Sequence, residues 1–146
     1  MSAKAGHACK LYYNTATWAS PTWAEIDLAR DLTLPLSRDY GDASSRASDF
    51  KVGVVGLLDT AVNGQTIWDP SDAGFAALLD ACLNGTTVEL AIMDGDITTA
   101  GSEGLHADFY VTKCDRGEPL GDLVAADFEA KPAATANDPE WMTVAS

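Results

Sequence analysis

Few side chains in this sequence are of a type that performs catalysis or binds a metal. The two histidines, His7 and His106, have no cysteine or second histidine at the spacing of a zinc site. The glycine-flanked serine of hydrolases, the phosphate loop and the paired histidines of metalloproteases are absent from the sequence. Asp94-Gly95-Asp96 could begin a calcium loop, but the further oxygen ligands are missing, and a hairpin turn explains it better. We therefore predict no catalytic site, no metal site and no cofactor.

Carboxylates are the exception, because Asp and Glu together number 22. Two carboxylates are enough for glycoside hydrolysis, so residue types alone leave a hydrolase open. Seven acids fall on the outward faces of predicted strands, which is typical of a negative surface and not of a two-residue site. Such a surface repels other anions within a Debye length of about 8 Å at physiological salt. The seven are Glu25, Asp27, Asp31, Glu89, Asp108, Asp127 and Glu129.

Composition and charge narrow the class of protein. The chain has 146 residues, 47% of them hydrophobic, which predicts one domain, residues 1–146, with a substantial core. A net charge of −13 argues against a protein that grips nucleic acid by its phosphates, but it suits one that lets nucleic acid pass without binding. We expect no signal peptide and no membrane span, and hence synthesis in the cytoplasm. Cys9, Cys82 and Cys114 are expected to be reduced thiols.

The elements that must position these side chains are mostly strands. One helix, about residues 70–84, interrupts them, which predicts a mainly β protein: an antiparallel β-sandwich or barrel with one flanking α-helix. Residues 1–9 are predicted to be a flexible arm, and residues 132–146 a flexible tail in which Trp141 could contact a partner. Alternation of hydrophobic and polar residues predicts six or seven strands. They are residues 10–13, 24–34, 50–56, 57–68, 87–93, 105–114 and 123–131.

The predicted helix has two different faces. We expect Asp69 or Ser71 to cap its start and Gly85 to end it. An apolar stripe at helical spacing is predicted to be buried: Phe75, Leu78, Leu79, Cys82 and Leu83. The opposite face has small residues, which indicate either cover by another subunit or an exposed helix rich in alanine, the best helix former. These are Ala73, Gly74, Ala77 and Ala81, of which the three alanines are the candidate subunit contacts.

The most irregular segment is residues 35–49, which we predict to be a long loop. A loop of this length inside a compact domain is usually functional or disordered. Its charges of both signs beside an aromatic ring favour a protein contact, and a mobile surface loop is the alternative. The candidate contact residues here are Arg38, Tyr40, Asp42 and Arg46.

Short pieces spread over most of the chain follow a familiar order. They are Lys10-Leu11-Tyr12-Tyr13, Trp23-Ala24-Glu25-Ile26, Asp31-Leu32-Thr33-Leu34, Asp42-Ala43-Ser44-Ser45-Arg46, Asp72-Ala73-Gly74-Phe75-Ala76-Ala77-Leu78, Met93-Asp94-Gly95 and Gly117-Glu118-Pro119-Leu120. In this order and spacing the chain resembles the tail tube (major tail) proteins of long-tailed bacteriophages and related phage-like particles. No strict motif defines the family, so the resemblance is one of overall pattern.

The resemblance implies a structural, non-enzymatic subunit that self-assembles into homo-hexameric rings, stacked into the hollow tail tube of a virion that delivers DNA. It implies a tape-measure protein and tail completion proteins as partners, and a sheath only if the tail is contractile. DNA would pass through the lumen without specific binding, and no membrane is involved. The long loop and the two ends of the chain would clamp neighbouring subunits. The candidate lumen acids are Asp27, Asp31, Asp108, Asp127 and Glu129.

Two alternatives stay open at this point. The tube of a phage-derived injection or secretion machine, or of a gene-transfer particle, shares the fold, and the sequence does not separate it from a phage tube. A small acidic β-sandwich binding module, or a hydrolase on the same fold, belongs to a different class. That class would require a carboxylate pair with a perturbed pKa in a deep cleft.

Overall fold

An antiparallel sheet of eight strands forms most of the body of the molecule. The computed structural model describes residues 3, 6 and 9–145, so most of the arm predicted at residues 1–9 lies outside the described residues. The strands are β1 (Lys10–Asn14), β2 (Trp23–Glu25), β3 (Ala29–Thr33), β6 (Val62–Ile67), β7 (Thr87–Met93), β8 (Glu103–Gly117), β9 (Ala125–Pro132) and β10 (Glu140–Thr143). Their order is β2-β1-β7-β8-β9-β6-β3, and β10 pairs with β8.

The hydrophobic core lies on the inner face of this curved sheet, under helix α1 (Ala73–Asn84). Strand β8 alternates as predicted, with Ala107, Phe109 and Val111 all buried in this core. Helix α1 packs against β7 and β8, where Phe75 and Leu78 are almost fully buried. The prediction of a mainly β, antiparallel fold with one helix is confirmed, and the described strands do not close into a barrel.

The helix begins later than predicted. Asp72 is the N-cap, and its carboxylate accepts a 3.0 Å hydrogen bond from the backbone N–H of Phe75. The two expected caps bind each other instead, because the Ser71 hydroxyl donates to Asp69 at 2.6 Å. Gly85 ends the helix as predicted, with a φ of 66° that favours glycine.

The buried stripe of the helix is rotated relative to the prediction. Gly74 and Ala81, assigned to the open face, are buried, and Leu83, assigned to the stripe, is 75% exposed. Gly74 lies against Ile26, which a Cβ on the glycine would approach to 3.0 Å. Small residues therefore mark the side where the sheet comes closest, because they let the backbone of the helix approach it.

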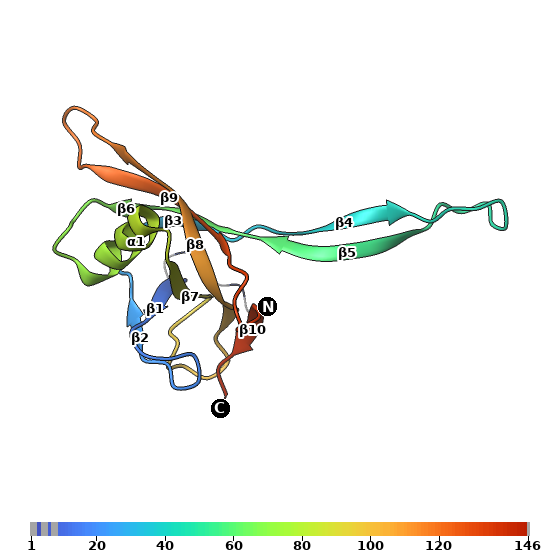
Figure 1. Cartoon of the computed structure of the whole chain (residues 1–146), viewed down its shortest axis with the longest axis horizontal. Helices are drawn as coiled ribbons and strands as arrows, with labels where there is room; N and C mark the ends of the chain where they lie inside the picture. Colours follow the sequence, from blue (N-terminus) through green and yellow to red (C-terminus); the bar gives the residue numbers. More distant parts are fainter. Residues whose placement is uncertain (1–2, 4–5, 7–8, 146) are drawn as a thin grey trace.

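The largest difference from the sequence prediction is a long hairpin, formed by β4 (Leu36–Asp42) and β5 (Gly53–Thr60). Figure 1 shows it projecting far from the body of the molecule. Residues 36–42 are therefore a strand, and the prediction of a loop over residues 35–49 is wrong there. Neither face of the hairpin is buried by the rest of the described chain, so the segment has no hydrophobic alternation for a sequence pattern to detect.

Two further segments differ from their predictions. The strand expected over residues 24–34 is divided into β2 and β3 by a turn in which Ile26 enters the core and donates its N–H to Leu11 O at 2.8 Å. Part of the predicted C-terminal tail is the strand β10, which pairs with β8 from Glu140 opposite His106 to Thr143 opposite Glu103. That tail prediction rested on polarity, which does not prevent a strand from joining an edge by backbone hydrogen bonds.

Gly104 is the glycine whose replacement would disturb this sheet most. A Cβ on Gly104 would lie 1.6 Å from the carbonyl oxygen of Ile92 on the neighbouring strand. We expect Gly104→Ala to reduce the free energy of unfolding by about 1–3 kcal/mol or more, because backbone must move. Gly117→Ala is the matched control on the same strand, since its Cβ would meet nothing closer than Ala125 O at 3.9 Å. Urea unfolding of both variants checks this, and equal stabilities would contradict it.

Candidate assembly surface

The β4–β5 hairpin exposes apolar side chains along its whole length. Leu57 is 91% exposed and Phe50, in the loop that joins the strands, is 79% exposed. A two-stranded hairpin alone is marginally stable in water, and a large exposed apolar surface usually marks a contact site. The hairpin therefore has the character of an element completed by another molecule. Its exposed apolar residues are Leu36, Tyr40, Phe50, Val52, Val54, Val55, Leu57 and Leu58.

All four contact residues predicted in this segment lie on the hairpin, and two of them form hydrogen bonds within it. Arg38 donates to the carbonyl oxygen of Gly56 at 3.1 Å. Asp42 accepts the backbone N–H of Ser44 at 2.8 Å, and hydrogen bonds from the hydroxyl and then the N–H of Ser44 hold the pKa of Asp42 below its usual value. Tyr40 and Arg46 are exposed. The hairpin thus presents apolar side chains mixed with charges of both signs.

Three of the five predicted lumen acids lie together on the polar outer face of the sheet. Asp31, Asp127 and Glu129 border one open hollow over β3, β6 and β9, with a volume of about 380 Å³. Gln65 on β6 donates to Asp127 at 3.2 Å. The opposite side of β9 is buried, where Phe128 packs in the core. This sheet is therefore acidic outside and apolar inside.

Two lysines lie on the same face, and of these Lys113 was missed by the sequence analysis, whereas Lys131 was expected to face outward with Asp127 and Glu129. Lys113 lies 3.3 Å from Asp115, and Lys131 lies 3.7 Å from Glu129. The predicted strand ended at Cys114, but β8 continues to Gly117 beyond a bulge, which brings Lys113 and Asp115 onto this face. Paired lysines lower the net negative charge of the face without reversing it.

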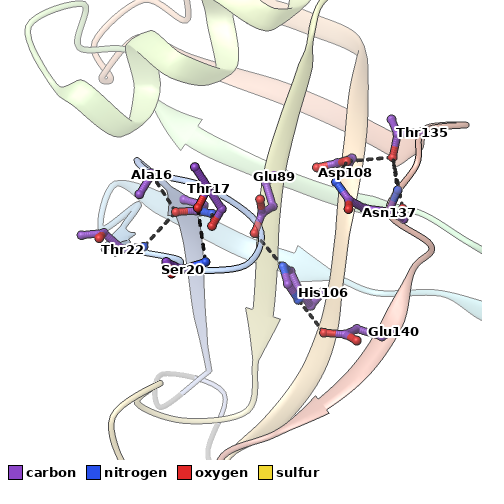
Figure 2. A network of polar contacts seen from close by, with 11 residues as sticks. Ala16, Thr17, Ser20, Thr22, Glu89, His106, Asp108, Thr135, Asn137 and Glu140 are labelled. Carbon is purple, nitrogen blue, oxygen red and sulfur yellow. Dashed lines mark hydrogen bonds and ion pairs between the residues drawn. The ribbon is translucent and has the colours of Figure 1, made fainter.

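The other two predicted lumen acids lie elsewhere. Asp27 is exposed in the turn between β2 and β3. Asp108 accepts hydrogen bonds from the Thr135 hydroxyl at 2.8 Å and the Asn137 amide at 3.3 Å, as Figure 2 shows. Asp108 therefore fixes the segment that leads to β10, and its carboxylate is already partnered.

The three predicted contact residues on the helix differ in their exposure. Ala73 is exposed and Ala77 is half-buried, so both can touch another molecule. Ala81 is only 3% exposed and belongs to the core of its own chain, so its assignment as a subunit contact is wrong. The cause is the rotation of the buried stripe described above.

His106 was expected on an outward face, but the structure buries it. Its Nε2 lies 2.7 Å from Glu89 on β7, and its Nδ1 lies 2.9 Å from Glu140 on β10, so the three side chains cross three strands (Figure 2). The Trp18 ring stacks on the imidazole at 3.9 Å, and Trp23 meets it edge-on at 5.0 Å. The covered imidazole, with both ring nitrogens in hydrogen bonds, fastens β7, β8 and β10 together.

The loop that carries Trp18 is held by its own polar contacts. Asn14 accepts the backbone N–H groups of Ala16 and Thr22, both at 2.9 Å. Ser20 donates its N–H to the Thr17 hydroxyl at 3.2 Å, and Figure 2 shows this loop folded toward the imidazole. The loop is therefore held in place over His106. In the sequence, the two neighbouring tryptophans were the only indication of this cover.

Among the residues that the structure describes, no three His, Cys, Asp or Glu side chains cluster in a way that could hold a metal ion. No helix in the described part of the chain is long and apolar enough to cross a membrane.

This arrangement of a curved antiparallel sheet, one packed helix and one long projecting hairpin is similar to solved structures from tails and a tail tube. The structure is similar to the tail of an empty gene transfer agent particle with C6 symmetry, at a TM-score of 0.74 and 14% identity, covering 97% of this chain and 100% of that one. It is similar to the SPP1 tail tube at a TM-score of 0.76 and 10% identity, covering 99% of this chain and 81% of that one.

A third similar structure comes from the six-fold symmetrised baseplate of an anti-feeding prophage, with a TM-score of 0.63, 11% identity and 99% of both chains covered. No protein-family model and no curated protein sequence matches the chain. The likeness is therefore one of fold, and at this level the predicted resemblance is confirmed.

A substitution in the histidine cluster tests which interaction holds β10 against β8. Glu140→Ala removes one carboxylate from the imidazole, and a hydrogen bond to a charged group contributes about 1.5–3 kcal/mol. We expect amides of Glu140–Thr143 to exchange with deuterium at least tenfold faster, with β9 unchanged. Glu118→Ala, on the exposed β8–β9 tip, is the control and should leave β10 protected. Unchanged exchange in Glu140→Ala would show that backbone pairing alone holds the strand.

Proposed function

We propose that the chain is the structural subunit of a tail tube, which self-assembles into hexameric rings that stack into a hollow conduit for DNA delivery. The observation that carries the proposal is the β4–β5 hairpin, an exposed apolar element that needs another molecule to cover it. The fold supports it, because similar structures come from tails and a baseplate with six-fold symmetry. The subunit would act by assembly and not by catalysis.

Open sheet edges supply a way to close the ring. Strand β3 is the outer strand at one end of the described sheet. Beyond Tyr110, β8 pairs only with β9 in the described structure, which leaves the other side of Val111–Gly117 without a strand. Unpaired edges are prone to pair with other chains, and head-to-tail pairing of two different edges generates a ring when the rotation closes. Joining β8 of one subunit to β3 of the next would make one continuous sheet.

The acidic face of that sheet would line the lumen. Asp31, Asp127 and Glu129 lie on it together, opposite the buried core face. An excess of carboxylates repels DNA phosphates, so that DNA would slide without specific binding. Asp27 and Asp108 lie off this hollow and are left out of the proposed lumen set.

The hairpin, the exposed part of α1 and Trp141 would contact neighbouring subunits. Arg38, Tyr40, Asp42 and Arg46 are on the hairpin, Ala73 and Ala77 on the helix, and Trp141 on β10. Further partners would be a tape-measure protein, tail completion proteins and, in a contractile tail, a sheath. A tube in a gene-transfer particle or an injection machine is the second candidate, favoured by the gene transfer agent and anti-feeding prophage structures.

Shortening the hairpin tests the assembly proposal. Residues 39–57 are replaced by Asn-Gly, a two-residue turn that can close the remaining strands after Arg38 and before Leu58. The body keeps its core, so we expect an unchanged melting temperature but no tubes by electron microscopy and a monomer by sedimentation. The full chain is the control. Tubes formed by the shortened chain would contradict the proposal.

Charge reversal tests the lumen assignment. We expect tubes of Asp127→Lys/Glu129→Lys to assemble and retain DNA, with retention lost at high salt because phosphate contacts release counterions. Glu118→Lys/Asp122→Lys makes the same change in charge on the exposed β8–β9 tip and should retain much less. DNA trapped in purified tubes is measured by absorbance after nuclease treatment. Equal retention by both pairs would place these acids outside the lumen.

A further inference from the structure

An apolar groove lies where β3, β7, β8 and β10 approach one another. It has a volume of about 310 Å³, and its lining includes Leu32, Leu34, Ile92, Met93 and Trp141. Trp141 is 52% exposed at its border. Such a groove is large enough to receive an aromatic ring, and burying one would remove apolar surface of both partners from water.

The polar border of the groove is acidic. Asp94 and Glu103 line it, and none of the described lining residues is a lysine or an arginine. Asp94 accepts the backbone N–H of Glu103 at 2.9 Å, which fixes the two residues side by side. The groove therefore suits an apolar group that is flanked by positive charge.

The tip of the hairpin, residues 43–52, has this chemistry. Phe50 is 79% exposed there. Arg46 and Lys51 are both exposed and outnumber the single acid of the tip, Asp49, although the whole chain has a net charge of −13. Neither basic side chain forms an ion pair within the described part of the chain.

We propose that Phe50 of one copy inserts into this groove of a second copy, with Arg46 and Lys51 facing Asp94 and Glu103. The proposal rests on the proposed tube function and names the contact that the hairpin makes. Figure 1 shows the hairpin tip far from β3, β7 and β10 of the same chain, so the occupant is another copy.

Charge selects Phe50 over the other exposed residues of the hairpin. Leu57 is more exposed, but two acids, Asp39 and Asp59, and one base, Arg38, lie around it on the paired strands, so acids outnumber bases there. These carboxylates would face Asp94 and Glu103 if Leu57 entered the groove, and like charges disfavour that contact. Leu57 therefore serves as the matched control for Phe50.

A double-mutant cycle measures the contact. Phe50→Ala and Trp141→Ala are each expected to raise the critical concentration for tube formation, by sedimentation, about tenfold or more. The two changes together should be little worse than either one, because they remove the same contact. Leu57→Ala combined with Trp141→Ala should be additive. Additive effects of Phe50→Ala and Trp141→Ala would overturn the proposal.

Charge exchange gives a second measurement with a different readout. Lys51→Glu and Glu103→Lys should each weaken assembly, and the pair together should restore it to within a few fold of the unmodified chain. Failure of the pair to restore assembly counts against the proposed orientation of the tip.

A photo-crosslinker at position 50 tests the same contact without changing Trp141. We expect assembled protein to give a crosslink between two chains at Leu32, Leu34 or Trp141, mapped by mass spectrometry. Crosslinks elsewhere would show that Phe50 contacts another site, and would overturn the proposal. Loss of tubes on shortening the hairpin, together with such crosslinks, would uphold the tube function while rejecting this groove. Tubes without the hairpin would reject both.

Discussion

The backbone hydrogen bonds of β8 are the interaction on which the rest of the structure depends. This strand of 15 residues pairs with β7, β9 and β10, and it also supports α1. Its first half is buried among other strands, and its second half extends past β7 with one side open. One continuous strand therefore joins the core to an open edge, which is the edge of the proposed contact between subunits.

Sequence patterns predict the parts of this molecule that bury one face. The alternation in β8 and β9 predicts their core residues, and Gly85 predicts the end of the helix, because burial and a left-handed backbone leave clear signatures. Strand β4 was missed, because its polar and charged residues do not alternate with apolar ones. Strand β5 lies within the strands predicted over residues 50–56 and 57–68. Ala81 was misplaced because a small residue suits both an open face and a close helix–sheet contact.

In the candidate surfaces, too, only the features with a local sequence pattern could be predicted. Alternation along each strand predicts that Asp31, Asp127 and Glu129 face outward, but the pairing of β6 with both β3 and β9, which brings them together, has no local signature. The bulge that turns Lys113 toward the same face depends on the register between β8 and β9, which no local pattern reveals. Likewise, the enclosure of His106 by Trp18 depends on how a loop folds over the sheet.

The hairpin is joined to the body of the molecule by very short connections. Leu34 and Pro35 alone separate β3 from β4, and Ala61 alone separates β5 from β6. The Thr60 hydroxyl donates to the carbonyl oxygen of Pro35 at 2.8 Å, which ties the two crossings together. A movement of the hairpin is thus transmitted to β3, the outer strand of the sheet. A force on the far end of the hairpin would turn β3, so that in the proposed tube twist would pass from one ring to the next.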